Sequence, residues 1–205
     1  MRGELLLKGL AFGFLLAATV GPMWVLCLRR TLASGALVGL ASGLGIALAD
    51  GFYGAIAAFG LTAISGFLLE HAFWIGLVGS AFLLYLGVKT LMSTPQIEEG
   101  GEKAVSLSGA LLSTLGLTLT NPPTILAFAA IFAGLGLASS ADYGAAAMVV
   151  GGVFAGSALW WVILAVGAGK LRHRIGARLF RAINVVAGIS ILGFAAWQIA
   201  ELVRQ

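Results

Sequence analysis

The sequence predicts an all-α membrane protein with six transmembrane helices, on the evidence of its composition, its long apolar runs and the positions of its charges. Of 205 residues, 60% are hydrophobic and 10% are charged, whereas a soluble domain has about 25% charged residues. So little charge cannot coat a surface that faces water, so lipid must cover most of it. The basic residues stand at the ends of apolar runs, as orientation signals do, and this placement argues against a nucleic-acid partner.

Two spans open the chain. The first is predicted at 9–28, and it is too long for the apolar part of a signal peptide. Arg29 and Arg30 follow it and are expected to anchor its cytoplasmic end. The second span lies within 36–61 and is interrupted only by Asp50. Both are therefore predicted to be retained membrane helices.

The third span is predicted at 72–92 and is followed by the only soluble-looking stretch of the chain. This stretch, 93–106, contains Pro95, two adjacent glycines and four charged residues, which are Glu98, Glu99, Glu102 and Lys103. We expect it to be a cytoplasmic linker between a first half, 9–92, and a second half, 107–203. The two halves are predicted to form a single membrane domain, 1–205.

The fourth apolar run, 104–141, is too long for one straight helix. At 1.5 Å per residue it would extend roughly 57 Å, against a hydrocarbon core of about 30 Å. Asn121-Pro122-Pro123 near its middle predicts either one broken helix that crosses once or a re-entrant hairpin. A single crossing places nine Lys and Arg residues, among them those of 170–181, in cytoplasmic loops and three on the other side. The count favours the single crossing, with both termini outside.

The last two spans are predicted within 143–169 and at 182–203, and six spans divide into two halves of three. An odd number of spans per half inverts the second half in the membrane. Gly21-Pro22 interrupts the first helix of one half and Asn121-Pro122 the first helix of the other. Helix breaks at corresponding places in inverted halves indicate the binding site of a transporter. The alternative is that membrane helices simply contain more Pro and Gly than soluble helices do.

The prolines are expected to free backbone carbonyls, because proline has no N–H to donate to the carbonyl four residues earlier. Pro22 would free the carbonyl of Ala18, and Pro122 that of Thr118. Carbonyls exposed near the midplane suit the ammonium group of an amino acid, and helix N-termini suit its carboxylate. Alternatively, the neighbouring threonine hydroxyls meet these carbonyls locally.

Asp50 is the strongest single candidate for a functional residue. It is the only acid deep inside a span, and an aspartate at a helix centre costs about 2.5–3.5 kcal/mol on insertion scales. Its carboxyl group is predicted to carry a proton or to hold a cationic substrate, with Tyr53 on the same helix face as a partner. A structural aspartate is the alternative. Ser42 and one ring of the Trp160-Trp161 pair are further candidates for the lining of a path.

No enzyme, metal site or cofactor is predicted. The single Cys27 cannot form an internal disulfide, and His71 and His173 stand near run ends, outside any cluster with ligand spacing. A membrane enzyme would need a group of acids, His or Arg at one membrane face, such as paired aspartates. The sequence contains no such group.

Two stretches carry a recognisable pattern. One is Thr19-Val-Gly-Pro-Met-Trp-Val-Leu-Cys-Leu-Arg-Arg-Thr-Leu-Ala, with Gly-Leu-Ala-Ser-Gly-Leu-Gly-Ile-Ala-Leu-Ala-Asp50 and the eleven residues after it; the other is Leu117-Thr-Leu-Thr-Asn-Pro-Pro-Thr-Ile-Leu126. In order and spacing they resemble the LysE-type amino-acid exporters, the lysine, threonine and homoserine exporters, over essentially the whole chain. The family commonly has Pro-Gly-Pro in its first helix, and Val20 replaces the first proline here.

This resemblance implies a secondary transporter in a bacterial-type cytoplasmic membrane that exports amino acids or small derivatives. Proton entry is the expected driving force, and amino acid, protons and membrane lipid are the expected partners, with a homo-oligomer left open. Members of the superfamily also move cations, so a cation or metal-ion exporter is one alternative. A non-transporting membrane assembly subunit is another.

Overall fold

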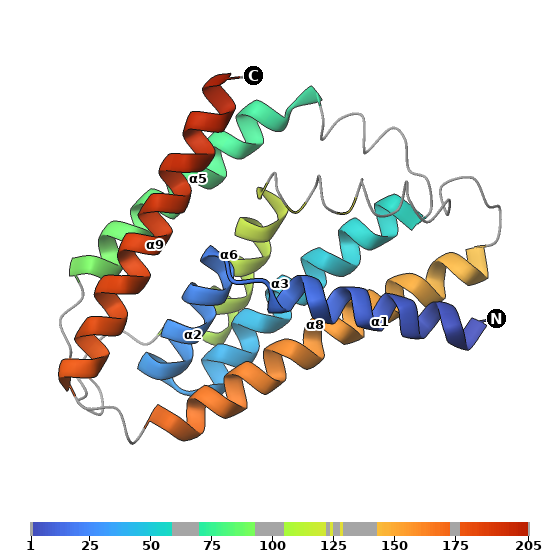
Figure 1. The fold of residues 1–205 in the computed structure, drawn as a ribbon, viewed down its shortest axis with the longest axis horizontal. Helices are drawn as coiled ribbons and strands as arrows, with labels where there is room; N and C mark the ends of the chain where they lie inside the picture. Colours follow the sequence, from blue (N-terminus) through green and yellow to red (C-terminus); the bar gives the residue numbers. More distant parts are fainter. Residues whose placement is uncertain are drawn as a thin grey trace.

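The computed structural model describes residues 2–58, 70–92, 105–121, 124, 128, 143–172 and 177–204, and the regular structure in these parts is helical. Pro122 and residues 93–104 of the expected linker lie outside the described residues. The helices of the described parts are α1 (Arg2–Ala18), α2 (Pro22–Ser34), α3 (Ala36–Ala58), α5 (Ala72–Met92), α6 (Leu107–Leu119), α8 (Tyr143–Leu171) and α9 (Ala177–Arg204) (Figure 1).

Most helix ends fall close to the charges that bound the apolar runs. α5 has the expected bounds, and α3 fills most of the expected second span. α9 begins at Ala177 and not at 182, so that Arg178 and Arg181 belong to its first two turns. Long basic side chains at a helix end can extend from the apolar region toward water, so they need not end the helix.

Four helices of the described chain, α3, α5, α8 and α9, are each long and apolar enough to cross a membrane. α1 and α2 together would make a fifth span, and this pair is bent by 75°. α6 has 13 residues, too few to cross alone. The rest of the fourth apolar run lies almost entirely outside the described residues, so the described chain contains four or five spans of the six expected.

The helices pack as a bundle with a helix pair beside it. α3 lies in the middle of the bundle, with α8 on one side and α6 on the other, and α1 packs along α8 (Figure 1). α3 and α8 are antiparallel, because Ala36 meets Gly169 at one end and Gly54 meets Val153 toward the other. α5 and α9 form the second pair, and α2 joins it to the bundle through α9.

α1 and α8 touch through glycines. A Cβ atom added to Gly13 would lie 2.1 Å from the carbonyl oxygen of Val153, and one added to Gly156 would lie 2.0 Å from that of Leu10. Gly9 and Gly152 are equally close to the opposite backbone. These four residues, called the glycine seam below, let the two backbones approach as small-xxx-small motifs do in membranes.

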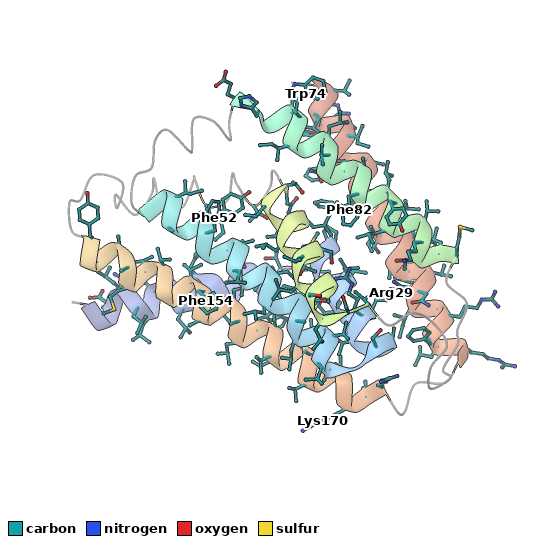
Figure 2. The ribbon with its side chains drawn as sticks, turned by 180° about the vertical axis from the view of Figure 1, so that it is seen from behind. Arg29, Phe52, Trp74, Phe82, Phe154 and Lys170 are labelled. Carbon is teal, nitrogen blue, oxygen red and sulfur yellow. The ribbon has the colours of Figure 1, made fainter. Side chains whose placement is uncertain are left out.

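Large apolar side chains cover much of the outside of the molecule. Phe52 of α3 and Trp74 and Phe82 of α5 are 48%, 65% and 38% exposed (Figure 2). In water such a surface would be an aggregation hazard, but in a bilayer it faces hydrocarbon. The chain is therefore a multi-pass membrane protein. The larger core cluster joins α1, α2, α3, α5, α6, α8 and α9 around Leu26, Cys27, Ala47, Trp161 and Ile191.

Candidate functional site

The chain changes direction sharply between α1 and α2. α1 ends at Ala18, and the hydroxyl of Thr19 donates to the carbonyls of Leu15, at 3.3 Å, and Leu16. α2 then begins at Pro22, where the ring presets φ and the missing N–H would have had no helical partner. The last turn of α1 is therefore capped by the hydroxyl of Thr19 before α2 begins.

The N-terminus of α2 has backbone donors without a partner in the helix itself. Gly21 is its cap and supplies no side-chain hydrogen bond, and the first helical bond runs from the N–H of Val25 to the carbonyl of Gly21 at 3.1 Å. The backbone N–H groups of Met23 and Trp24 therefore have no partner within the helix. A helix start of this kind attracts negative charge.

α6 ends in the same way as α1. The hydroxyl of Thr120 donates to the carbonyls of Gly116 at 2.9 Å and Leu117 at 3.2 Å, the same spacing that Thr19 uses. The N–H of Asn121 donates to the carbonyl of Thr118 at 3.2 Å. Two helices that lie a hundred residues apart in the chain thus stop on a threonine just before a predicted proline break.

A cavity of about 230 Å³ lies where these helix ends meet. Five of the residues proposed from the sequence line it: Gly21, Pro22, Asp50, Thr118 and Asn121. The rest of the wall comes from both ends of the α1–α2 connection, from Ile46 of α3, from Thr124, and from Trp161 and Phe194 of α8 and α9. Residues far apart in the chain are therefore brought together at one site.

Asp50 is the carboxyl group of this cavity. Its side chain is 3% exposed, and Ser157 of α8 donates a hydrogen bond of 2.7 Å to its Oδ2 atom. Within the described ranges no basic side chain forms an ion pair with it, since the ion pairs there, Lys8 with Glu4 and Arg204 with Glu201, lie at the surface. Asp50 is thus a buried acid that a hydroxyl, not a cation, holds in place.

Tyr53 does not pair with Asp50, contrary to the partnership suggested by their spacing. Its hydroxyl donates to the carbonyl of Leu119, at the end of α6, and its ring packs against Phe128 at a centroid distance of 5.9 Å. Tyr53 is buried but does not line the cavity. The two side chains part because Ser157, from the facing helix, reaches Asp50 and the last turn of α6 reaches Tyr53.

Ser42 belongs to a different polar group, built around a buried arginine. The Arg30 guanidinium, 7% exposed, donates to Ser42 Oγ at 3.3 Å and to the carbonyl of Ala110 at 3.2 Å. Thr114 of α6 donates to the carbonyl of Ser42 at 2.7 Å. Arg30 therefore ties α2, α3 and α6 together inside the protein, and the expectation that it anchors a helix end at the membrane surface is wrong.

The neighbouring residue, Arg29, also contacts another helix of the protein. The Nε of Arg29 donates to Oδ1 of Asn184 on α9 at 3.1 Å. Sequence reasoning missed this pairing, as it missed the one made by Arg30, because a pair of arginines after an apolar run looks the same whether it meets lipid or protein. Serine and asparagine elsewhere in the chain were the available signal.

The sequence also proposed Ala18 and Pro122 as residues of the site. Ala18 ends α1 between lining residues, and among the described residues its carbonyl accepts no hydrogen bond, because the Thr19 hydroxyl serves the preceding carbonyls. Pro122 lies outside the described residues. The local repair by threonine therefore occurs, but at Leu15 and Leu16 and not at the carbonyl that Pro22 frees.

Two tryptophans also line the cavity. Trp24 follows directly from the start of α2, and Trp161, 2% exposed, comes from the middle of α8. Trp161 rather than Trp160 lines the cavity, since the Trp160 ring packs edge-on against Phe14 at 5.3 Å. Sequence reasoning kept both rings as candidates, because helical spacing alone does not say which of two adjacent rings faces inward.

The cavity can hold a small polar molecule between opposite partial charges. The start of α2 has N–H groups without a helical partner, and Asp50 and Thr118, near the end of α6, line the same cavity. In the described part of the chain, no three His, Cys, Asp or Glu side chains gather as metal ligands. The arrangement suits a ligand that carries both a negative and a positive group.

Comparison with known proteins agrees with a transport site. A model of the LysE type translocator family matches residues 14–201. The chain is 33% identical over 183 residues to "Uncharacterized membrane protein YahN" of Escherichia coli (strain K12), covering 86% of this chain and 81% of that protein. It is 25% identical over 196 residues to "Putative amino acid efflux protein YcgF" of Bacillus subtilis (strain 168), covering 93% of each. No solved structure matches the chain.

Proposed function

Because this chain belongs to the LysE type translocator family, we propose that it is a secondary transporter that exports amino acids or small amino-acid derivatives. Proton entry would drive the export, and alternating access would move the cargo. The observation that carries the proposal is the cavity at the two helix ends, with its single buried carboxyl group. The amino-acid efflux named for the Bacillus subtilis relative supports the choice of cargo.

The size of the cavity supports a small cargo. Pockets for drug-sized ligands have volumes of about 300–1,000 Å³, and this cavity has about 230 Å³. A single amino acid fits that volume better than a peptide or a lipid does. The mixture of apolar wall, free N–H groups and one carboxyl group also suits a zwitterion with a short side chain.

Asp50 supports the coupling to protons. A buried carboxyl group without a cationic partner is costly when ionised, so it exchanges a proton as its surroundings change. When the cavity opens to one side Asp50 would take up a proton, and when it opens to the other side it would release one. Proton entry would thereby be linked to the exit of the cargo.

The packing of the helices supports two inverted halves. If α1, α3 and α5 correspond to α6, α8 and α9, then the contact of α1 with α8 has its counterpart in the contact of α6 with α3. The remaining large contacts, α3 with α8 and α5 with α9, join corresponding helices to each other in antiparallel pairs. Inverted halves of this kind rock around a fixed site in many transporters.

The positions of the basic residues support an orientation in a cytoplasmic membrane. Lys89 and Lys170 lie in the last turns of α5 and α8, and Arg178 lies in the first turn of α9. The antiparallel pairs bring these helix ends to the same end of the molecule as the start of α3, away from both termini (Figure 1). We assign this end to the cytoplasm and both termini to the outside.

The test is transport by the purified protein in liposomes with a pH gradient. A panel of labelled amino acids, with small and large side chains, is offered together with Na⁺, K⁺ and Zn²⁺. We expect at least one small amino acid to accumulate against its gradient and no cation to do so. Uphill movement of a metal ion or inorganic cation alone would favour the alternative exporter, and movement of nothing would favour a non-transporting subunit.

A further inference from the structure

The two tryptophans of the cavity have unpaired indole N–H groups. The Nε1 atoms of Trp24 and Trp161 are buried and have no hydrogen-bond partner in the described part of the chain. A buried tryptophan N–H usually finds an acceptor, and leaving it without one is costly. Because the side chain of tryptophan has a donor and no acceptor, only an electron-rich atom can complete these two sites.

Both tryptophans line the cavity. Trp24 also stands at the start of α2, where its own backbone N–H and that of Met23 have no helical partner. The positive end of the α2 dipole lies at the same place. The residues that carry these side-chain and backbone donors, Met23, Trp24 and Trp161, all line the cavity.

An unpaired acceptor also belongs to a residue that lines the cavity. The Asn121 Nδ2 donates to Thr124 Oγ1 at 2.9 Å, while the Asn121 Oδ1 is buried without a partner in the described residues. Asp50 lines the same cavity, and the C-terminal end of α6 adds the negative end of its dipole. These groups suit an ammonium group, whereas the donors of the two tryptophans and of α2 suit a group of opposite charge.

We propose that the indole N–H groups of Trp24 and Trp161, with the free N–H groups at the start of α2, bind the carboxylate of the cargo. The proposal rests on amino-acid export and makes it narrower: a free carboxylate is required, so amino-acid amides and decarboxylated amines are rejected. A carboxylate has enough lone pairs to accept from several donors at once. Hydrogen bonds to a charged group are about twice as strong as neutral ones, so they discriminate well against an amide.

Transport kinetics in liposomes test the proposal. The probes are L-alanine, L-threonine and L-leucine, each paired with its amide. We expect the wild type to move an amino acid and not its amide, and Trp24→Phe and Trp161→Phe to raise the KM about tenfold, as the loss of one charged hydrogen bond requires. Trp160→Phe is the matched control, because Trp160 Nε1 is also buried and unpaired but lies outside the cavity wall; its KM should not change.

A second measurement, on the wild-type protein, is independent of transport and of the folding of any variant, and an isosteric replacement then complements it. In wild-type protein labelled with ¹⁵N-tryptophan, the indole resonances of Trp24 and Trp161 should shift on addition of the amino acids, and those of the exposed Trp74 and Trp197 should not. Replacement of Trp161 by benzothienylalanine, which keeps the ring shape without the N–H, should remove its resonance and raise the KM.

The outcomes separate the two proposals. Equal transport of acid and amide, or unchanged KM values in Trp24→Phe and Trp161→Phe, would overturn the carboxylate site and leave the exporter standing. Unmoved indole resonances during saturable amino-acid binding would do the same. If no amino acid is transported but the two resonances shift with acetate, amino-acid export fails and the carboxylate site stands. If neither transport nor a shift is seen, both fail.

Discussion

Asp50 is a carboxyl group whose burial in a membrane costs free energy, and the surrounding protein nevertheless holds it in place. Its carboxyl group has one strong hydrogen bond, from Ser157 at 2.7 Å, and otherwise faces the cavity region among apolar side chains. A structural role would be served by any hydrogen-bonding side chain of the same size. Proton transport needs a group that titrates.

Asp50→Asn is therefore expected to abolish uphill export driven by a pH gradient. The amide keeps the size and most of the hydrogen bonding but cannot take up or release a proton. Exchange of labelled for unlabelled cargo should persist, since exchange moves no net proton. Glu70→Gln, at an exposed acid just before α5, is the control and should transport normally. Loss of exchange as well would mean that Asp50 holds the ammonium group, and normal uphill transport would leave it a structural role.

Arg30 is held in place by residues that are distant in the chain, Ser42 and Ala110. Arg30→Lys keeps the charge but replaces a planar fork by a compact ammonium group, which cannot serve Ser42 and Ala110 in the same way. We expect a loss of stability of about 2 kcal/mol, measured as a lower melting temperature in detergent. Arg178→Lys, at a helix end, should melt like the wild type. Equal melting of both variants would show that the hydrogen bonds of Arg30 do not stabilise the fold.

At the scale of the elements, the bend between α1 and α2 depends on the residue that starts α2. Pro22 prevents the two helices from continuing into each other, because it offers no N–H to the carbonyl of Ala18. Pro22→Ala restores that donor. We expect the variant to insert and express normally while its transport rate falls at least severalfold, as measured in the same liposomes. Undiminished transport would reduce the break to a packing feature.

The glycine seam gives a prediction with an internal control. Gly156→Ala places a Cβ atom 2.0 Å from a backbone carbonyl of α1, so the helices must separate, at a cost of about 1–3 kcal/mol. Gly151→Ala, on the same helix, meets nothing within 4 Å and should be neutral or stabilise α8 by up to about 1 kcal/mol. Melting in detergent checks both. A stable Gly156→Ala protein would show that α1 and α8 are not held this tightly.

Some of these elements follow from the sequence by local rules and some do not. The bounds of α5, the end of α1 before Gly21-Pro22, and the selection of Asp50 rest on charge, proline chemistry and hydropathy, which act within a few residues. The pairing of α1 with α8, the burial of Arg30 and the places of Trp24 and Trp161 in the cavity lining depend on which helices meet. An apolar helix in lipid shows little difference between its buried and its lipid-facing side, so its pattern does not indicate its neighbours.

For the whole molecule, the orientation in the membrane can be measured with cysteines, because the chain has a single one, Cys27, which is buried. In a Cys27→Ala background, Arg204→Cys near the end of α9 should react with an impermeant thiol reagent in intact cells. Lys170→Cys, in the last turn of α8, should react only after the cells are opened. The reverse pattern would contradict the outward termini and favour a re-entrant hairpin at Asn121.

The glycine seam also determines when the helices can pack together during synthesis. Gly9 contacts Val149, which is 140 residues later in the chain, so α1 enters the bilayer long before its partner exists. At synthesis rates of about 5–20 residues per second, the gap is roughly 7–28 s. During that time the glycine face of α1 has only lipid or the insertion machinery to contact. The contact of α1 with α8 therefore forms only when α8 arrives, and a chain released before that point would expose an unpaired helix for quality control to recognise.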